Sequence, residues 1–219
     1  MLEELVPPEV VVVESFGDIP DVVLFPEEEA ALGRAVEKRR REFATVRSCA
    51  RQAMARLGLP PAPIVPGERG APGWAAGLVG SMTHCDGYRA SALSRAADVV
   101  AVGVDAEVSG PLPRGVLDLI SLPSEHEMLS SLASAPGTSW DRLLFSAKEA
   151  VYKAWFPITG RWLSFEDAIV AIAPADGTFT ARLLVPGPVV NGRPLREFSG
   201  RWIARDGLIL TAIVIARTC

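Results

Sequence analysis

Two long segments of the chain carry apolar residues at the spacing of an α-helix. Residues 26–58 keep that spacing with one interruption, and the pattern ends at Gly58, before two prolines. Residues 138–155 repeat it, with apolar side chains at i, i+3 and i+7 from Leu144, and Pro157 is expected to stop the helix. One long helix is therefore expected in each half of the chain.

A shorter helical pattern covers residues 114–133 and is divided at Pro123. Ser124 stands three residues before Glu127, which is the spacing of an N-terminal capping box. We expect two short helices here, the second capped by Ser124.

Runs of β-branched and alternating apolar residues fill much of the remaining sequence. Residues 98–108 predict a central strand, and Asp206-Gly207 between two alternating runs predicts a hairpin turn. Residues 60–80, dense in proline and glycine, predict a loop with short extended pieces. The expected strands are residues 11–15, 88–93, 98–108, 167–173, 178–185 and two runs within 199–217.

The order of a long helix followed by strands occurs twice along the chain. It predicts an α+β fold of two similar α/β lobes, residues 1–103 and residues 104–219.

Composition narrows the class of protein. Apolar residues make up 49% of the chain, enough for a buried core, and a formal net charge of −4 argues against nucleic acid as the main partner. Three scattered cysteines are too few for a disulfide framework or a four-ligand zinc site, which indicates the reducing cytoplasm. The acidic N-terminus and the lack of an apolar run of ~20 residues predict neither a signal peptide nor a membrane span.

Basic residues gather in the later turns of the first long helix. Arg40, Arg47 and Arg51 recur at i, i+7 and i+11, so they line one helix face at ~100° per residue. Such a face either holds an anion or is an ordinary solvated charged surface.

Two acidic residues follow one another at alternate positions of an expected strand. Asp105 and Glu107 are two residues apart, so their side chains emerge on the same face and repel each other unless a cation lies between them. Mg²⁺ commonly takes one or two protein carboxylates together with water and phosphate oxygens. The alternative is a solvated face of an alternating strand.

The second long helix holds Lys148 and Lys153, two of the chain's three lysines. Glu149 lies ~140° round the helix from the apolar stripe and one turn before Lys153. Such a pair is by default a surface ion pair worth about 0.2–0.5 kcal/mol. The choice of lysine in a chain that otherwise uses arginine favours phosphoryl chemistry, because lysine can give up a proton when its pKa is lowered.

The stretch GSMTHC, residues 80–85, adds hydroxyl groups on Ser81 and Thr83 and a ring nitrogen on His84. Groups of this kind in a glycine-led segment commonly contact phosphate oxygens, although a histidine of this kind is more often a satisfied core residue.

Three segments resemble, in order and spacing, the signature blocks of the 4'-phosphopantetheinyl transferase superfamily: GERGAPGWAAGLVGSMTHC, VGVDAE and FSAKEAVYKAW. The likeness is to its monomeric bacterial members, which activate polyketide, nonribosomal peptide and siderophore synthases. The resemblance implies two lobes related by a pseudo-twofold axis, with the active site in the cleft between them. It implies transfer of the 4'-phosphopantetheine arm of coenzyme A to a serine hydroxyl of an apo acyl or peptidyl carrier protein, with release of adenosine 3',5'-bisphosphate.

The resemblance also implies roles for individual residues. Asp105, Glu107 and Glu149 are expected to hold Mg²⁺, or Mn²⁺, against the pyrophosphate of coenzyme A. Glu149 is expected to take the serine proton, directly or through a bound water. Lys153 is expected to steady the charge that develops on the phosphate or to protonate the leaving oxygen.

The remaining expected contacts are with coenzyme A itself. Ser81, His84 and Lys148 are expected at its phosphates, Arg39 and Arg47 at its 3'-phosphate, Lys153 at the pyrophosphate, and Arg69, Gly70, Ala71 and Pro72 against its adenine. By angular spacing Arg40 competes with Arg39. Some members have lysine where Ala71 stands, so adenine recognition here would depend on backbone groups and Arg69.

Two other functions stay open: a non-catalytic coenzyme A or nucleotide-binding module, and a magnesium-dependent phosphoester hydrolase. A hydrolase would more naturally show a second metal cluster or an activated nucleophile, and the sequence has neither G-x-S-x-G nor H-E-x-x-H. A binding module would have little use for Glu149 beside Lys153. The expected partners are apo carrier domains, with no nucleic acid and no membrane, and the protein is expected to be a cytoplasmic monomer.

Overall fold

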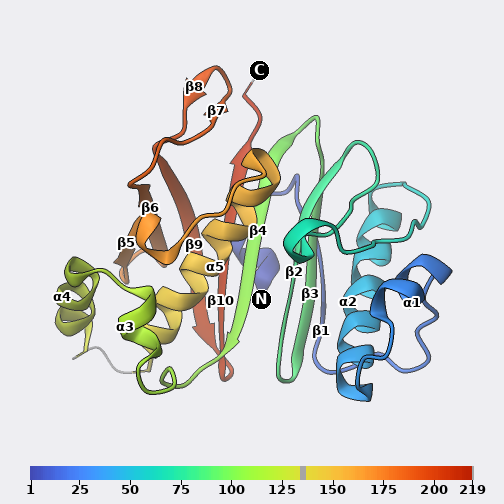
Figure 1. Ribbon diagram of the computed structural model, residues 1–219, viewed down its shortest axis with the longest axis horizontal. Coiled ribbons are helices and arrows are strands. Elements are labelled where there is room, and N and C mark those ends of the chain that lie inside the picture. The colour runs from blue at the N-terminus through green and yellow to red at the C-terminus, as the bar shows by residue number, and fades with distance from the viewer. Residues whose placement is uncertain (134–136, 219) are drawn as a thin grey trace.

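Helices and antiparallel sheets are combined in one fold in the computed structural model, which describes residues 1–133 and 137–218 (Figure 1). The helices are α1 (Pro26–Leu32), α2 (Glu37–Arg56), α3 (Val116–Ile120), α4 (Pro123–Leu132) and α5 (Trp140–Thr159), with short 3-10 helices at Leu2–Leu5, Glu68–Gly70 and Phe165–Asp167. The strands are β1 (Val11–Ser15), β2 (Leu78–Cys85), β3 (Tyr88–Arg95), β4 (Val99–Val108), β5 (Ala168–Ala173), β6 (Thr178–Leu183), β7 (Val189–Val190), β8 (Arg193–Pro194), β9 (Glu197–Arg205) and β10 (Leu208–Ala216).

The N-terminal part of the chain forms a three-stranded sheet in the order β1-β3-β2 with α2 packed against β3 and β1. The interruption expected within residues 26–58 separates α1 from α2. Small side chains of α2, such as Ala50 and Ala53, pack with Leu93 of β3 and Ile64 of the following loop in a buried cluster. The long loop that follows α2 thereby stays anchored to the helix.

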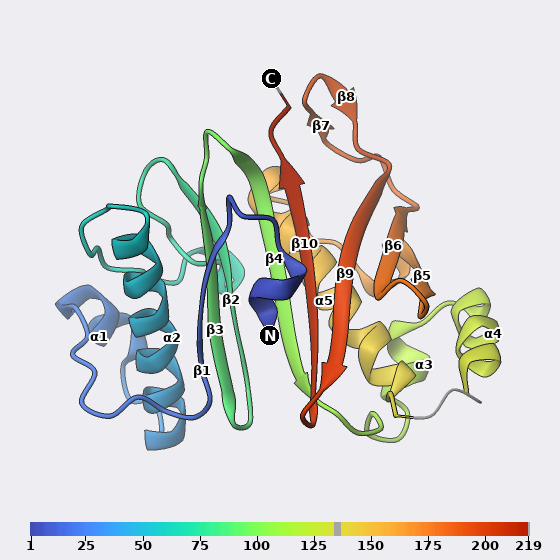
Figure 2. The same cartoon turned by 180° about the vertical axis from the view of Figure 1, so that it is seen from behind.

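The C-terminal part forms a five-stranded antiparallel sheet in the order β4-β10-β9-β6-β5, covered on one face by α5 (Figures 1 and 2). Gly103 allows α5 to lie directly on β4, because a Cβ atom there would come within 2.1 Å of the Ala150 carbonyl oxygen. The Asp206-Gly207 turn joins β9 to β10, and both residues have positive φ, at 53° and 77°, as a tight hairpin turn requires.

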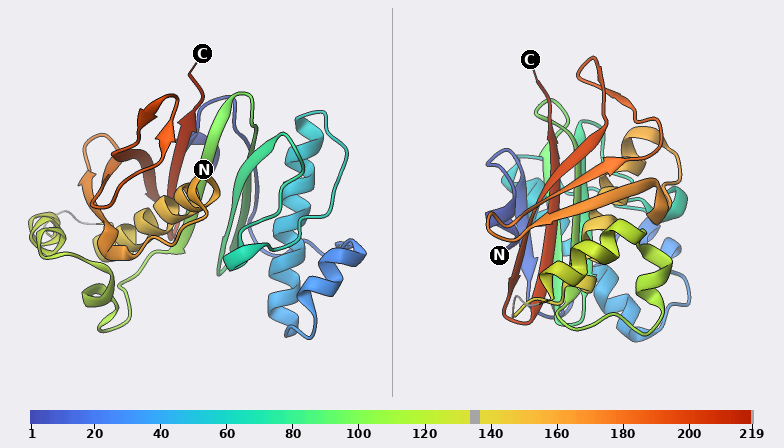
Figure 3. Two further views of the ribbon diagram at one scale, coloured as in Figure 1. Left: turned by 45° about the horizontal axis from the view of Figure 1, so that its top comes forward. Right: turned by 90° about the vertical axis from the view of Figure 1, so that its left-hand side faces the viewer.

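The two sheets meet where β2 and β4 lie side by side in the middle of the molecule (Figure 3). These strands share no backbone ladder. Instead, the Val104 amide donates to Ser81 Oγ at 3.1 Å and the Ala106 amide donates to Thr83 Oγ1 at 2.9 Å. Residues 98–108 were expected to form a central strand; β4 is central in the molecule but is the edge strand of its own sheet.

Two details of the helices differ from the sequence analysis. The N-cap of α4 is Leu122, not Ser124, because Pro123 occupies the first helical position and Glu125 accepts the Leu122 amide at 2.7 Å. Pro157 does not stop α5, which continues to Thr159. A proline is tolerated so close to the end, and Gly160 provides the left-handed C-cap.

The α+β class is confirmed. Each half has one long helix on an antiparallel sheet, which fits the two-lobe prediction; the pseudo-twofold axis and the boundary after residue 103, within β4, stay predictions. Within the described ranges, no helix is both long and apolar enough to cross a membrane.

Candidate active site

A cavity of about 370 Å³ opens where α2, β2, β4 and α5 converge. Its walls combine cations from the N-terminal part with carboxylates and an ammonium group from the C-terminal part. The lining residues are Arg39, Phe43, Val46, Arg47, Pro66, Arg69, Gly70, Ala71, Pro72, Gly80, Ser81, Met82, Thr83, His84, Asp105, Glu149, Tyr152, Lys153, Phe156 and Pro157. The structure thus brings together most of the residues expected at the site, but Glu107 and Lys148 do not line this cavity.

Asp105 lies at the centre of this arrangement and is only 5% exposed. Lys153 Nζ donates to its Oδ1 at 2.7 Å and to the Val104 carbonyl at 3.1 Å. The other oxygen of Asp105, Oδ2, is buried and has no hydrogen-bond partner among the described residues. A buried carboxylate oxygen without a partner is costly, so this atom suits a cationic ligand.

Glu107 and Glu149 flank Asp105 and are both half-buried. Burial and then the Asp105 carboxylate raise the pKa of Glu107, and the same two causes raise the pKa of Glu149. The three carboxylates therefore repel one another, as Asp105 and Glu107 were expected to do. An ion with a double positive charge and a preference for oxygen ligands would relieve this repulsion.

As the side chains stand, no group of three or more His, Cys, Asp or Glu residues in the described parts of the chain is arranged to hold a metal ion. Two of the carboxylates already form ion pairs, Asp105 with Lys153 and Glu107 with Arg142. Glu107 is also not among the residues that line the cavity. The donor set fits a divalent cation in chemistry, but the expected three-carboxylate cluster is not formed.

Arg39 and His84 form the opposite wall of the cavity, where Arg39 supplies the positive charge. Arg39 Nη1 donates to His84 Nε2 at 2.7 Å, which places the ring proton on Nδ1, 3.8 Å from Glu42. Partial burial and the Arg39 guanidinium lower the pKa of His84. His84 is therefore neutral at pH 7 in this arrangement.

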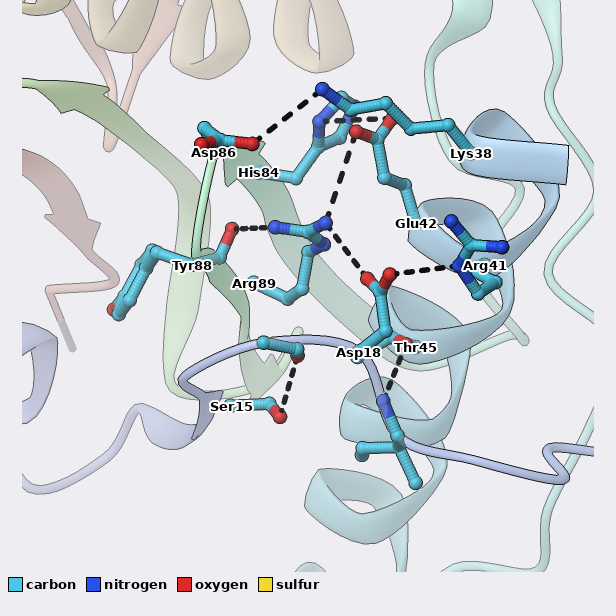
Figure 4. A network of polar contacts seen from close by, with 12 residues as sticks. Ser15, Asp18, Lys38, Arg41, Glu42, Thr45, His84, Asp86, Tyr88 and Arg89 are labelled. Atoms are coloured by element: carbon cyan, nitrogen blue, oxygen red, sulfur yellow. Dashed lines mark hydrogen bonds and ion pairs between the residues drawn. The ribbon is translucent and has the colours of Figure 1, made fainter. Parts of the chain in front are cut away.

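The hairpin that carries His84 is held by Arg89 of β3, which is 3% exposed (Figure 4). Arg89 Nη2 pairs with Asp18 at 2.7 Å, and its Nη1 donates to the Tyr88 carbonyl at 3.1 Å. Glu42 faces both Arg89 and His84 at 3.8 Å. This network fixes the end of β2 against α2.

The competing arginines of α2 lie in different places in the structure. Arg39 lines the cavity, whereas Arg40 pairs with Glu29 at 2.7 Å and Arg51 with Glu28 at 2.9 Å, both acids being on α1. The helix face that carries Arg40, Arg47 and Arg51 therefore packs largely against the acids of α1.

Arg47 does line the cavity, but its side chain is only 6% exposed. It donates to the Ile64 carbonyl at 3.0 Å, and its guanidinium lies 3.1 Å from the centre of the Phe43 ring. Burial lowers the pKa of Arg47 to about 10. Part of its hydrogen-bonding capacity is thus already used to position the loop after α2.

The loop of residues 69–72 forms another wall of the cavity. Arg69 adopts positive φ, at 53°, and its guanidinium lies 5.0 Å from the ring of Trp162, which follows α5. This contact joins the loop of the N-terminal part to the C-terminal part.

Lys148 is not brought to this cavity. It lines a second one, of about 160 Å³, and its ammonium group pairs with Glu125 at 2.8 Å and donates to the Phe165 carbonyl at 2.7 Å. Both partners of the pair are almost completely buried, at 3% and 0% side-chain exposure. A phosphate contact would require Lys148 to give up these partners, so the structure disfavours the expected phosphate role.

Replacing Glu125 by glutamine is expected to lower the free energy of unfolding by about 3–5 kcal/mol, because it leaves the Lys148 ammonium buried without its counter-charge. Glu127→Gln, an exposed neighbour on α4, is the matched control and should change stability by less than about 0.5 kcal/mol. Urea denaturation measures both. Equal stability of the two variants would contradict a structural role for the pair.

Sequence reasoning missed Tyr152, Phe43 and Arg142. Tyr152 lines both cavities, and its hydroxyl group is buried without a partner among the described residues. Its position one turn after Glu149 on the same helix face was a usable signal. The aromatic lining from Phe43 carried no such signal, because an aromatic residue at helical spacing usually belongs to the core.

The chain resembles known proteins along almost its whole length. A family profile described as the 4'-phosphopantetheinyl transferase N-terminal domain matches residues 27–94, and one described as the 4'-phosphopantetheinyl transferase superfamily matches residues 101–199. The chain is 59% identical over 220 residues to 4'-phosphopantetheinyl transferase Svp of Streptomyces mobaraensis, covering 99% of this chain and 89% of Svp. It is 49% identical to 4'-phosphopantetheinyl transferase PptT of Mycobacterium tuberculosis, covering 92% and 90% of the two chains.

Among solved structures, the holo-[acyl-carrier-protein] synthase (AcpS) of Thermotoga maritima matches with a TM-score of 0.42 and 19% identity, over 55% of this chain and 65% of that chain.

Proposed function

The chain belongs to the 4'-phosphopantetheinyl transferase superfamily and transfers the phosphopantetheine arm of coenzyme A to carrier proteins; on this premise we propose that Asp105, Glu107 and Glu149 would together hold a Mg²⁺ ion beside the bound pyrophosphate. The observation that carries the proposal is the buried, unpartnered Oδ2 of Asp105. The mutual repulsion of the three carboxylates supports it, because a bound dication is the simplest way to offset that repulsion.

In the reaction, the serine oxygen of the carrier attacks the β-phosphorus of coenzyme A, and the bond to the bridging pyrophosphate oxygen breaks. Glu149, which lines the cavity, takes the proton of the serine hydroxyl, directly or through a bound water. When bound, Mg²⁺ would neutralise charge on the phosphate oxygens.

Lys153 moves from Asp105 to the phosphate oxygens as coenzyme A binds. Its ammonium group stabilises the charge of the departing adenosine 3',5'-bisphosphate, or protonates the leaving oxygen. Two observations support this role: Lys153 lines the cavity, and it is held there by one carboxylate oxygen and one carbonyl.

The rest of coenzyme A lies against the N-terminal part. Arg39 and His84 bind the 3'-phosphate, with Arg47 beneath them, and Ser81 contacts a phosphate. The backbone of Gly70, Ala71 and Pro72 and the Arg69 side chain form the adenine site. Because Ser81 Oγ already accepts the Val104 amide, it can donate its hydroxyl proton to a phosphate oxygen.

Arg39→Ala is expected to raise the KM for coenzyme A roughly 10- to 100-fold, because a hydrogen bond to a charged group is worth about 1.5–3 kcal/mol. The KM for 3'-dephospho-coenzyme A should hardly change. Arg40→Ala is the matched control, since Arg40 pairs with Glu29 outside the cavity. If Arg40→Ala reproduced the effect and Arg39→Ala did not, the assignment of the 3'-phosphate site would be wrong.

The partners are apo acyl and peptidyl carrier domains of polyketide, nonribosomal peptide or siderophore synthases. One relative, enterobactin synthase component D of Escherichia coli, is 34% identical over 127 residues. The protein acts as a monomer in the cytoplasm and uses neither nucleic acid nor a membrane. A net charge of −4 supports the exclusion of nucleic acid.

Intact-mass spectrometry of an apo carrier protein tests the reaction. Incubation with the enzyme, coenzyme A and Mg²⁺ should add the mass of one phosphopantetheine arm, and a carrier whose acceptor serine is replaced by alanine should gain nothing. A phosphoester hydrolase or a binding module would add no mass to either carrier.

A further inference from the structure

Arg142, in the first turn of α5, contacts the outer of the two acids on β4. Its Nη1 donates to Glu107 Oε2 at 3.0 Å, its Nε to the Gly110 carbonyl at 3.2 Å and its Nη2 to the Pro111 carbonyl at 2.9 Å. All three nitrogens of the guanidinium are therefore in use. The carbonyls of Gly110 and Pro111 fix the plane of the guanidinium, and its remaining nitrogen, Nη1, donates to the Glu107 carboxylate.

Arg142 lies on the same face of α5 as the two catalytic side chains, Glu149 and Lys153. Arg142, Glu149 and Lys153 are spaced i, i+7 and i+11, which places them within about 40° of one another around the helix. Arg142 contacts Glu107 at one end of this row and Lys153 contacts Asp105 at the other. Glu149 lies between the two cations.

These two cations differ in how far they can move. Lys153 has a flexible side chain, and its partners are one carboxylate and one carbonyl. Arg142 is held by two backbone carbonyls in addition to Glu107, and its side chain is only 20% exposed. A guanidinium fixed in this way cannot follow a substrate, but it can hold one oxygen of Glu107 and leave the other free.

We infer that Arg142 is the positioning residue that orients the Glu107 carboxylate toward the divalent cation. The inference rests on the metal site proposed above. Carboxylates that bind metals are generally hydrogen-bonded by an outer partner, and loss of such a partner typically costs 10- to 100-fold in metal affinity. Arg142 binds neither the metal nor the substrate, so it acts only through Glu107.

Binding of Mn²⁺ tests this role without a measurement of turnover. Electron paramagnetic resonance of free Mn²⁺, with saturating coenzyme A and the full chain, gives the dissociation constant of the ion. Arg142→Ala should weaken Mn²⁺ binding by roughly 10- to 100-fold. Arg142→Lys should recover only part of this loss, because an ammonium group cannot hold the two carbonyls and the carboxylate together.

Asp141→Ala is the matched control. Asp141 holds the same segment, accepting the Leu112 amide at 2.8 Å, but it does not touch Glu107. Its loss should therefore leave Mn²⁺ affinity close to that of the unmodified chain. In a Glu107→Gln background, Arg142→Ala should cause no further weakening.

Unchanged or tighter Mn²⁺ binding by Arg142→Ala would overturn the inference, as would a loss of equal size with and without Glu107. The proposed metal site is checked separately by Asp105→Asn, which should abolish Mn²⁺ binding. If Asp105→Asn bound Mn²⁺ normally, the metal site itself would be wrong. If only the Arg142 variant behaved normally, the site would stand and the positioning role would fall.

Discussion

A chain carrying Glu149→Gln is expected to bind coenzyme A almost normally and to transfer phosphopantetheine roughly 10²–10⁴ times more slowly than the unmodified chain, which is the usual contribution of a general base. Glutamine keeps the shape of the side chain but cannot accept the serine proton. Glu149 lines the cavity, one turn before Lys153 on the same face of α5. Single-turnover rates with an apo carrier measure the chemical step, and calorimetry with coenzyme A measures binding.

The control for this variant is Glu197→Gln, because Glu197 is an exposed carboxylate on β9 that does not line the cavity. It should leave both quantities unchanged. A Glu149→Gln chain with a near-normal transfer rate would mean that another group takes the serine proton.

Asp105→Ala is expected to remove Mg²⁺-dependent transfer almost completely. Stabilisation of phosphoryl charge by a metal is worth several kcal/mol, so the loss should be roughly 10³-fold or more. Asp105 is the most buried of the three carboxylates and the one with the unpartnered oxygen. The transfer rate as a function of Mg²⁺ concentration, with and without a chelator, provides the measurement.

Asp86→Ala is the matched control for this second variant, because Asp86 is an exposed aspartate of the β2–β3 turn that does not line the cavity. It should keep the full Mg²⁺ response. Full activity of the unmodified chain in excess chelator would refute the metal assignment, whatever the Asp105 variant does.

The central residues of the site could be found in the sequence because their spacing carries the geometry. Asp105 stands at an alternate position to Glu107 on a strand, and Glu149 and Lys153 are one turn apart on a helix, so each pair shares a face. Gly103 explains why these two elements meet, since only a residue without a side chain lets α5 approach β4 so closely. A glycine two residues before an acid is visible in the sequence, but the helix that uses it is not.

Other features depend on contacts between elements distant in the sequence. Angular spacing alone favoured Arg40 as much as Arg39, and only the position of α1, with its row of acids, shows that Arg40 faces away from the cavity. Lys148 follows the same motif as Lys153, yet its partner Glu125 lies 23 positions earlier, on α4. Arg142 gave no signal either, because its three partners belong to the segment around the end of β4.

Local sequence rules failed where two rules competed. Ser124 fits the cap of α4 by spacing, but Pro123 prefers the first helical position and moves the cap to Leu122. Ser81 and Thr83 were interpreted only as phosphate contacts. In the structure their hydroxyl groups also satisfy amides on the free edge of β4, so the same residues join the two sheets and line the cavity.

The most direct test of the account is the anomalous scattering of Mn²⁺ in crystals of the chain grown with coenzyme A. We predict one Mn²⁺ peak per chain, in contact with oxygens of Asp105, Glu107 and Glu149 and with the pyrophosphate, and with Lys153 no longer on Asp105. A coenzyme A complex with Mn²⁺ bound elsewhere, or with Asp105 still paired to Lys153 and no ion at the three carboxylates, would contradict the proposed metal site.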